Sequence, residues 1–390
     1  MNKMTKSNKI LIKTLFGLEE TLKDELLNIG VKSVKVLNRA VETEGDIELI
    51  YKCNLYLRTA LAVYLKIDTG ITKNQNDLYD FIRAIKWQEL FSGHKSIAVE
   101  AFTNSKTLKH SRFTEQKVKD GIVDYFRDTT GVRPQVNLER PDIKIYVHIN
   151  NNTCSLYLNS SGTPLYYRGY NKRTGKAPVN DILAAGIILI SGWDKKSFLY
   201  DPMCGCGTIP AEAYMLANNI PPTINRNYFS FKNWQNYDNK LWENIIEEAK
   251  RKINKTNTKI YGNDIDNKVL QDAQINFNRI DPENKIKLTN SDFFDIEPPD
   301  TQGTIISNPP YGMRFNDLDI KEFYKKLGDK LKFDYRNYVA WIISSELDAL
   351  KMIGLRPEKK IVLFNGPLEC KLNKYSIYEG SKKTNRKDYK

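Results

Sequence analysis

The stretch from Phe198 to Ala213 constrains the fold of this chain more than any other part of its sequence. Three apolar or aromatic residues lead into Asp201, and a Gly-Cys-Gly turn follows at residues 205–207. A helix is predicted from Ile209, because Pro210 is tolerated in a first helical turn. A strand, a tight glycine loop and a helix in this order indicate an open α/β sheet, whose ligand lies over the carboxyl end of the strand.

The spacing of the glycines limits the ligand. Gly205 and Gly207 allow a sharp turn and let a ligand approach the main chain closely. Pro210 stands where a dinucleotide-binding fingerprint has its third glycine, and no Lys-Ser or Lys-Thr pair follows as in a phosphate-binding loop. The motif therefore disfavours a pyrophosphate or a nucleoside triphosphate, and on its own it leaves a purely structural turn open.

Two later apolar runs each end in a carboxylate. The run at residues 259–264 ends in Asp264, at a position that commonly binds the two hydroxyls of a ribose. Asp266 is interpreted instead as the cap of the helix that follows, because a short carboxylate there accepts from free backbone N–H groups. The run at residues 286–292 ends in Asp292, which can accept a hydrogen bond from the exocyclic amine of adenine.

A third run, residues 303–307, ends in Asn308-Pro309-Pro310-Tyr311. The prolines carry no N–H, so this loop presents acceptors, the Asn308 side-chain oxygen and the Pro309 carbonyl. Two acceptors that converge on one amino group hold it in place, and the Tyr311 ring offers a face for an extrahelical base. The alternative is a strand-ending turn with an incidental tyrosine, and the glycine loop and carboxylates ahead of it argue against that.

Taken in chain order, these motifs resemble those of the class I S-adenosylmethionine-dependent amino-methyltransferases, and in particular the THUMP-containing RNA guanine-N2 methyltransferases. They are Asp201-Pro-Met-Cys-Gly-Cys-Gly-Thr208, Asn263-Asp264-Ile-Asp266, Asp292 and Asn308-Pro-Pro-Tyr311. The sequence departs from that family at Met203, Cys206 and Met313, where Phe, Ser and an acid are expected.

This resemblance implies S-adenosylmethionine as the cofactor and a target amine held by the catalytic residues Asn308, Pro309, Pro310 and Tyr311. It implies a cofactor site formed by Asp201, Cys204, Gly205, Gly207, Thr208, Asp264, Ile265, Asp292, Phe293 and Asn308.

Composition and charge point the same way. The chain of 390 residues has a formal net charge of +13, which suits a polyanionic partner such as nucleic acid, although a generally lysine-rich composition is the alternative. Its five cysteines and three histidines show no metal-ligand spacing, so we expect no metal and infer a reducing, cytoplasmic location. Residues 1–8 have no apolar core of signal-peptide length, and no apolar run approaches membrane-spanning length, so no membrane partner is expected.

The predicted architecture is α/β: a Rossmann-like class I methyltransferase domain over residues 163–380, preceded by two α+β domains. Alternating strand and helix signals predict a ferredoxin-like domain at residues 1–68. Residues 69–162 resemble a THUMP RNA-binding domain, and residues 381–390 form a basic tail. An extra loop and helix between residues 217 and 256 are expected on the methyltransferase sheet, with Trp234 and Trp242 in the core. The last two strands are predicted to form the reversed hairpin of this fold.

Two basic segments are candidates for RNA contact. One, near a predicted helix start, is interpreted as a phosphate-binding segment, with a solvated loop as the alternative. The other is the linker at residues 165–180, which mixes aromatic and basic residues as single-strand-binding surfaces do, although its tyrosines fit a hydrophobic hinge equally well. The candidate residues are Lys106, Lys109, Arg112, Arg168 and Arg173.

The resulting expectation is N2-methylation of a guanosine in structured RNA. The 23S ribosomal RNA is favoured over tRNA, because the extra N-terminal unit resembles that of the large-subunit enzyme. Adenine-N6 and glutamine-amide methylation share the Asn-Pro-Pro-Tyr motif but do not explain the two domains ahead of it. A non-enzymatic ribosome-assembly protein is a further alternative, against which the intact Gly205, Asp264 and Asn308 count. The oligomeric state is not indicated.

Overall fold

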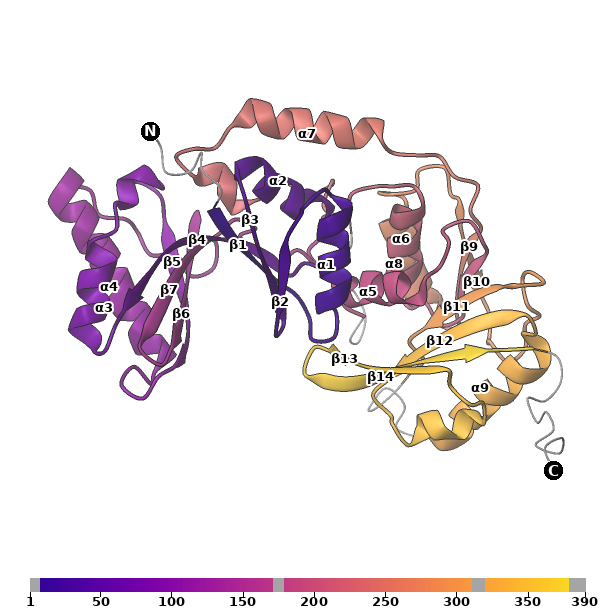
Figure 1. Cartoon of the computed structure of the whole chain (residues 1–390). Helices are drawn as coiled ribbons and strands as arrows, with labels where there is room; N and C mark the ends of the chain where they lie inside the picture. The colour runs from indigo at the N-terminus through magenta and orange to yellow at the C-terminus, as the bar shows by residue number, and fades with distance from the viewer. Residues whose placement is uncertain (1–7, 171–178, 311–319, 379–390) are drawn as a thin grey trace. The chain divides into compact units, whose positions relative to one another are not determined.

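The computed structural model describes residues 8–170, 179–310 and 320–378 (Figure 1). The chain divides into two compact units, one of Met1–Gly169 with Pro221–Lys252 and the other of Tyr170–Ile220 with Ile253–Lys390. Each unit contains one seven-stranded sheet. Among the described residues, no helix combines the length and the apolar character needed to cross a membrane.

The sheet of the first unit has the strand order β2-β3-β1-β4-β7-β6-β5, and only the β5–β6 pair is parallel. Strand β4 pairs with β1 on one side and β7 on the other, so the ferredoxin-like and THUMP parts share one continuous sheet. The strands are β1 (Asn8–Lys13), β2 (Val34–Leu37), β3 (Ala40–Gly45), β4 (Ala62–Ile71), β5 (Ile97–Asn104), β6 (Ile143–Asn150) and β7 (Thr153–Asn159).

Helices cover one face of this sheet, and their apolar residues form a single core cluster with it. They begin and end at conventional caps: Asp46 accepts from the N–H of Leu49 at the start of α2, and α4 ends at Gly131 with a left-handed backbone. The helices are α1 (Glu19–Asn28), α2 (Ile47–Tyr56), α3 (Gln75–Arg83), the short 3₁₀ helix η2 (Trp87–Glu89) and α4 (Ser111–Thr130).

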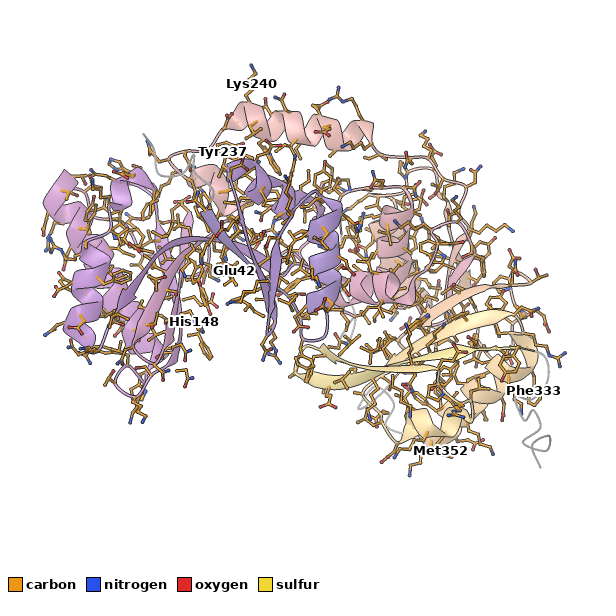
Figure 2. All side chains as sticks on the ribbon, viewed as in Figure 1. Glu42, His148, Tyr237, Lys240, Phe333 and Met352 are labelled. Carbon is orange, nitrogen blue, oxygen red and sulfur yellow. The ribbon has the colours of Figure 1, made fainter. Side chains whose placement is uncertain are left out.

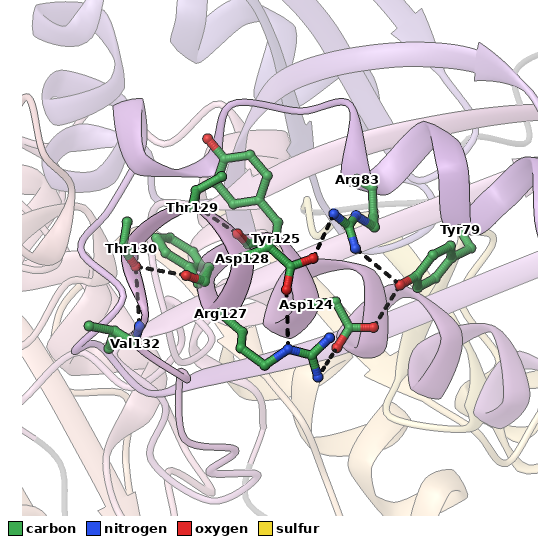
Figure 3. A network of polar contacts seen from close by, with 10 residues as sticks. Tyr79, Arg83, Asp124, Tyr125, Arg127, Asp128, Thr129, Thr130 and Val132 are labelled. Atoms are coloured by element: carbon green, nitrogen blue, oxygen red, sulfur yellow. Dashed lines mark hydrogen bonds and ion pairs between the residues drawn. The ribbon is translucent and has the colours of Figure 1, made fainter.

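Polar side chains join α3 to α4 (Figure 3). The Tyr79 hydroxyl donates to the Asp124 carboxylate at 2.6 Å, and Arg83 forms an ion pair with Asp128 at 2.9 Å (Figure 3). Arg127 contacts both acids, so two helix surfaces are linked by one network. Such partly exposed pairs add little stability individually, and we regard this network as fixing the register of the two helices.

The segment expected on the methyltransferase sheet belongs to the first unit instead, which corrects that prediction. Its helix α7 (Asn239–Arg251) packs on α2, and the 3₁₀ helix η3 (Ser230–Asn233) precedes it. The Trp242 ring lies 5.7 Å from that of Tyr51, measured between centroids, and both tryptophans, Trp234 and Trp242, are buried. Their core location is therefore confirmed, but the core is that of the first unit.

The sheet of the second unit has the order β10-β9-β8-β11-β12-β14-β13. Its first five strands are parallel, and β14 is antiparallel to both of its neighbours, which confirms the predicted reversed hairpin. The strands are β8 (Leu199–Asp201), β9 (Ile260–Asp264), β10 (Ile286–Asn290), β11 (Gly303–Ser307), β12 (Tyr338–Ser344), β13 (Lys359–Asn365) and β14 (Leu368–Ser376).

The connecting helices complete a doubly wound α/β unit, as predicted. Asn180 caps α5 by accepting from the N–H of Ile182, and Asp266 caps α8 by accepting from the N–H of Lys268, so both predicted caps are confirmed. The helices are α5 (Asp181–Ser191), α6 (Thr208–Ala217), α8 (Asn267–Phe277), α9 (Ile320–Asp334) and the 3₁₀ helix η5 (Ala349–Ile353).

Candidate functional site

The predicted polar residues meet at one edge of the second sheet. The parallel strands β9, β8 and β11 are neighbours in that order, and they end in Asp264, Asp201 and Ser307. Because the carboxyl ends of parallel strands lie at the same edge, the sheet brings together the glycine loop after β8, the carboxylate of β9 and the Asn308 loop after β11. These segments are far apart in the sequence, and the topology makes them one site.

The two glycines of the loop serve different purposes. Gly205 has a φ of +55°, and no atom lies within 4 Å of the position that a Cβ would occupy, so a ligand can approach the backbone there. Gly207 has a φ of +82°, and a Cβ on it would lie 2.5 Å from the Phe277 ring. Gly207 is thus required for the packing of α6 against α8. Its predicted contact with a cofactor stays a prediction.

Asp264 is held in place at the end of β9. One of its carboxylate oxygens accepts from the N–H of Gly205 at 2.8 Å, and the other accepts from the N–H of Asp266 at 3.0 Å. The next residue, Ile265, leaves 67% of its surface exposed. This corner fits a nucleoside. The half-buried Asp264 carboxylate can accept hydrogen bonds from ribose hydroxyls, and the exposed Ile265 side chain can pack on the flat face of the base, beside the open space at Gly205.

Two asparagines that sequence reasoning did not select support this edge. The buried Asn263 donates to the carbonyls of Pro202 and Ser291, at 3.1 and 3.0 Å, and so ties the loops after β8 and β10 to β9. Asn290 donates to the carbonyls of Asp264 and Ile265, at 2.9 and 3.0 Å, and fixes the turn after β9. The sequence signal for Asn263 is its place directly before Asp264, within the motif that carries the family resemblance.

Other predicted cofactor residues lie beneath the surface. Phe293 is 3% exposed and stacks on Tyr335 with a centroid distance of 5.5 Å, so its side chain belongs to the core. Cys204 and Thr208 are each 8% exposed. Asp292 is half-buried and accepts from the N–H of Phe294 at 3.0 Å. Of this group, Asp292 retains the most capacity to meet a ligand, and all four contacts stay predictions.

Asp201 is a buried acid at the end of β8, with 2% of its surface exposed. Burial, with a smaller contribution from the nearby Asp264 carboxylate, raises the pKa of Asp201 to about 7, although the N–H of Met203 donates to it at 3.2 Å. Burial therefore favours the protonated form of this side chain over a wider pH range than for an ordinary aspartate. A cation brought near it would favour the charged carboxylate.

The Asn308 loop leaves the neighbouring strand β11 at the same edge. Ser307 and Pro309 are buried, whereas Asn308 and Pro310 are partly exposed, so the Asn308 amide lies at the surface of the site. Tyr311 and Met313 lie outside the described residues. Binding of an amine by this loop stays a prediction.

Family models match the chain in three consecutive blocks: the RlmL ferredoxin-like domain at residues 9–64, the THUMP domain at residues 72–159 and the RMKL-like methyltransferase domain at residues 168–374. The last match covers more than half of the sequence. The chain belongs to the RMKL-like methyltransferase family. The resemblance deduced from the motifs and the predicted order of domains are both confirmed.

Relatives of this RMKL-like methyltransferase differ in how much of their own length they share with it. A Synechocystis protein named as an RNA methyltransferase, slr0064, is 37% identical over 364 residues, which are 93% of this chain and 95% of the relative. The ribosomal RNA large subunit methyltransferase K/L of Shewanella frigidimarina is 33% identical over 371 residues, which are 94% of this chain and 52% of the relative. The chain therefore spans about half the length of the K/L relatives that it matches.

Solved structures agree with this membership. SMU.472, a methyltransferase complexed with SAH, superposes with a TM-score of 0.86 at 26% identity and covers 96% of this chain and 100% of its own. A methylase from Clostridium difficile 630 gives the same TM-score at 30% identity, with the same coverage. TrmN from Thermus thermophilus, at 18% identity and a TM-score of 0.68 over 95% of this chain and 99% of its own, shares the fold.

The basic segment of the THUMP part is well exposed. Lys106, Lys109 and Arg112 all have exposed side chains at or near the start of α4. Lys109 and Arg112 line an open groove of about 440 Å³ together with Phe113, whose ring is 39% exposed. The first turn of α4 contains no acidic residue, so nothing there repels a phosphate. Contact with RNA at this segment stays a prediction.

Arg168 does not have the exposure expected of an RNA contact, which corrects that prediction. Its side chain is fully buried, and its guanidinium donates to the carbonyls of Arg58 at 2.6 Å and Leu165 at 3.1 Å. Arg226 likewise donates to several carbonyls of residues 161–167, so buried cations hold this stretch of the linker in place. Arg173 lies outside the described residues.

Metal chemistry gains no support from the side chains. Over residues 8–170, 179–310 and 320–378, no group of three or more His, Cys, Asp or Glu residues is placed to hold an ion. The described cysteines are free and buried, and burial raises the pKa of the Cys204 thiol well above its usual value.

Proposed function

We propose that this methyltransferase transfers a methyl group from S-adenosylmethionine to the N2 amine of a guanosine in 23S ribosomal RNA. One observation carries the proposal: the Gly205–Asp264 corner and the Asn308 loop leave neighbouring strands at the same sheet edge. A nucleoside cofactor and an amine acceptor therefore have adjoining places. The names of the K/L relatives support a large-subunit ribosomal substrate, and the THUMP match supports RNA.

The residues of this chain would hold the methyl donor through its nucleoside part. Asp264 accepts from the two ribose hydroxyls, Ile265 covers one face of the adenine, and Asp292 accepts from the adenine amine. S-adenosylmethionine supplies a methyl group on a positively charged sulfur, which is a good leaving group, so the protein has mainly to position the reactants. The buried Asp201 adds a negative charge close to this corner when it is ionised.

The Asn308 loop would hold the target. The Asn308 side-chain oxygen and the Pro309 carbonyl each accept a hydrogen bond from the guanine N2 amine. These two bonds direct the nitrogen lone pair toward the methyl group. Tyr311 would stack on the extrahelical base. Residues 1–68 and 69–162 are proposed to hold the RNA, with Lys106, Lys109 and Arg112 on its phosphates, while residues 163–380 carry out the transfer.

Replacing Asn308 by alanine tests the assignment. We expect a loss of about 10²–10³-fold in kcat, comparable to the loss of one hydrogen-bonding group that stabilises a transition state, with the cofactor Kd unchanged in calorimetry. The control is Asn290→Ala, which loosens the turn that carries Asp264 and Ile265 and should weaken cofactor binding. Full activity of the Asn308→Ala variant would refute the proposed catalytic role.

The identity of the target is tested in cells that lack this gene. Nucleosides from separated 23S RNA and tRNA are compared by mass spectrometry, and we expect one N2-methylguanosine to be missing from 23S RNA. Its loss from tRNA instead, or the loss of an N6-methyladenosine, would replace the target while keeping the chemistry. A protein that binds no S-adenosylmethionine in titration would instead be an RNA-binding assembly factor.

A further inference from the structure

The sheet of the first unit has a second face, opposite to the one that its helices cover. Residues alternate along each strand, so Ile10 and Ile12 belong to the main core, whereas Leu11 and Lys13 lie on the other face. That face has a small cluster of its own, formed by Ala62, Tyr64, Tyr146 and Tyr157 with Leu11 packed against it. We call it the tyrosine face. Figure 2 labels two further residues on it, Glu42 beside Leu11 and His148 beside Phe102.

The tyrosine face combines aromatic rings with lysines. The rings of Tyr64 and Tyr146 lie 5.3 Å apart and those of Tyr146 and Tyr157 lie 6.0 Å apart, measured between centroids. The Lys13 ammonium lies 3.5 Å from the Tyr146 centroid, and the Lys66 ammonium lies 6.0 Å from that of Tyr157. Both lysine side chains are partly exposed, so an ammonium held over an aromatic ring can still meet a phosphate, although burial lowers the pKa of Lys13.

Next to the tyrosines, Phe102 and His148 are directly opposite each other on β5 and β6. Their rings are stacked at a centroid distance of 5.5 Å and an angle of 5°, and Phe102 leaves 54% of its surface exposed. Burial, and the nearby Lys13 charge, lower the pKa of His148, so the imidazole is neutral at pH 7. A neutral, flat and partly exposed aromatic pair is a suitable surface on which an unpaired base can stack.

The charges on this face favour an anionic partner. This face carries Lys9, Lys13, Lys66 and Lys144 against three acids, Glu42, Glu44 and Glu100. Lys9 lies opposite Glu44, and Lys144 forms an ion pair with Glu100 at 2.9 Å. Together with the net charge of +13 of the whole chain, this leaves the face suited to a phosphate-bearing ligand. The aromatic residues add base stacking, which a purely ionic phosphate site lacks.

We propose that the tyrosine face binds a single-stranded segment of the RNA substrate, with an unpaired base stacked on Phe102 and phosphates beside Lys13 and Lys66. The inference rests on the proposed function in so far as the substrate is RNA. It adds a second RNA-binding surface, on the sheet itself, to the basic segment at the start of α4. Stacking of this kind tolerates any base and requires that the strand be unpaired.

The test measures binding of the full chain to a fluorescent single-stranded RNA oligonucleotide by anisotropy. Phe102→Ala should weaken binding about 5- to 100-fold, the range for the loss of one stacked base. The matched control is Phe333→Ala in the other unit, whose ring is 57% exposed and is labelled in Figure 2, and it should change the Kd less than twofold. Lys66→Ala should lower the slope of log K against log salt by about 1, and Lys240→Ala on α7 should leave it unchanged.

Three outcomes would overturn the proposal. They are wild-type affinity in Phe102→Ala, an equal loss for a fully paired RNA duplex, and a change of oligomeric state in sedimentation that accounts for the loss. The Asn308→Ala variant separates this proposal from the catalytic one. It should bind the single-stranded RNA as the wild type does. The binding measurement can therefore contradict the tyrosine-face proposal without affecting the proposal of methyl transfer, and the activity measurement can contradict the latter without affecting the former.

Discussion

The two described sheets have the same number of strands, and their candidate functional residues lie in different places. In the second unit, neighbouring parallel strands all end at one edge, and the polar residues Asp201, Asp264 and Asn308 gather there. In the first unit, antiparallel neighbours end at opposite edges, so no edge collects such a set. The aromatic residues and lysines of the tyrosine face lie instead across one face of that sheet. In this chain, parallel strands bring candidate residues together at the ends of neighbouring strands, whereas antiparallel strands leave them spread over one face of the sheet.

Burial follows the same division. Strand β12 of the second unit is buried at nearly every position, as expected for a strand covered on both faces. Strand β5 of the first unit alternates from Val99 onward between half-buried and exposed residues, as expected for a strand with one covered face. The face that the helices leave uncovered exposes Phe102 and part of its lysine side chains, although its tyrosines are buried. The covered sheet instead surrounds the Gly205–Asp264 corner with buried core residues.

The largest expected effect separates the two units by stability. Trp242→Ala removes a ring that packs on Tyr51, Phe229 and Phe231 at 5.7, 5.4 and 5.1 Å, and should destabilise the first unit by about 3–5 kcal/mol. In calorimetry, the unfolding transition that S-adenosylmethionine does not raise should move to a lower temperature, and the transition that it does raise should keep its temperature. If both transitions move together, the inserted helix supports the second unit as well.

This insertion shows what the sequence could and could not predict. Burial of Trp234 and Trp242 is predicted because large aromatic side chains are highly buried on average, and it is confirmed. Their location does not follow, because no local pattern says which sheet an amphipathic helix will meet. The segment follows α6 in the chain, which favours the methyltransferase sheet, yet Thr223 donates to the carbonyl of Asn54 in the first unit.

A second prediction concerns the acid at the functional edge. The pKa of Asp201 is about 7 in the folded protein, above its ordinary value of 3.8, so folding is most favourable with respect to this group below about pH 4. This contribution is lost as the pH rises through 7. Asp201→Asn should therefore unfold at a higher temperature than the wild type at pH 8, because its free energy of unfolding is larger by up to about 4 kcal/mol. Near pH 4 the two proteins should unfold at the same temperature.

The control for this experiment is Asp194, an exposed acid whose pKa is lowered in the folded protein. Hydrogen bonds from the N–H groups of Ser197 and Lys196 lower the pKa of Asp194. Asp194→Asn should thus lower the unfolding temperature at pH 8 and approach the wild type as the pH falls. A pH-independent difference for Asp201→Asn between pH 4 and 8, measured by thermal scans, would show that its carboxyl is not perturbed.

The site itself was more predictable than the linker. Asp264, Asn308 and the glycine loop each follow a strand, and the strand order needed to unite them is implied by the resemblance. The position of Arg168 was not predictable in this way. A cation among aromatic residues is equally typical of an RNA-binding surface and of a buried guanidinium that donates to backbone carbonyls. Its partners, the carbonyls of Arg58 and Leu165, are backbone atoms that no side-chain pattern can reveal.

The smallest expected effect tests the cofactor corner at its most exposed residue. Ile265→Ala removes apolar surface that would cover the adenine, and should weaken S-adenosylmethionine binding about 3- to 10-fold in calorimetry, corresponding to roughly 1 kcal/mol. Ile275→Ala, on the 43%-exposed Ile275 of α8, is the matched control and should leave the affinity unchanged. Because Ile265 is already exposed, its loss costs the fold little, so a change in Kd reports on the ligand. If Ile265→Ala and Ile275→Ala bind S-adenosylmethionine equally well, the adenine does not pack on Ile265, and the proposed contact of Asp264 with the ribose would need a separate test.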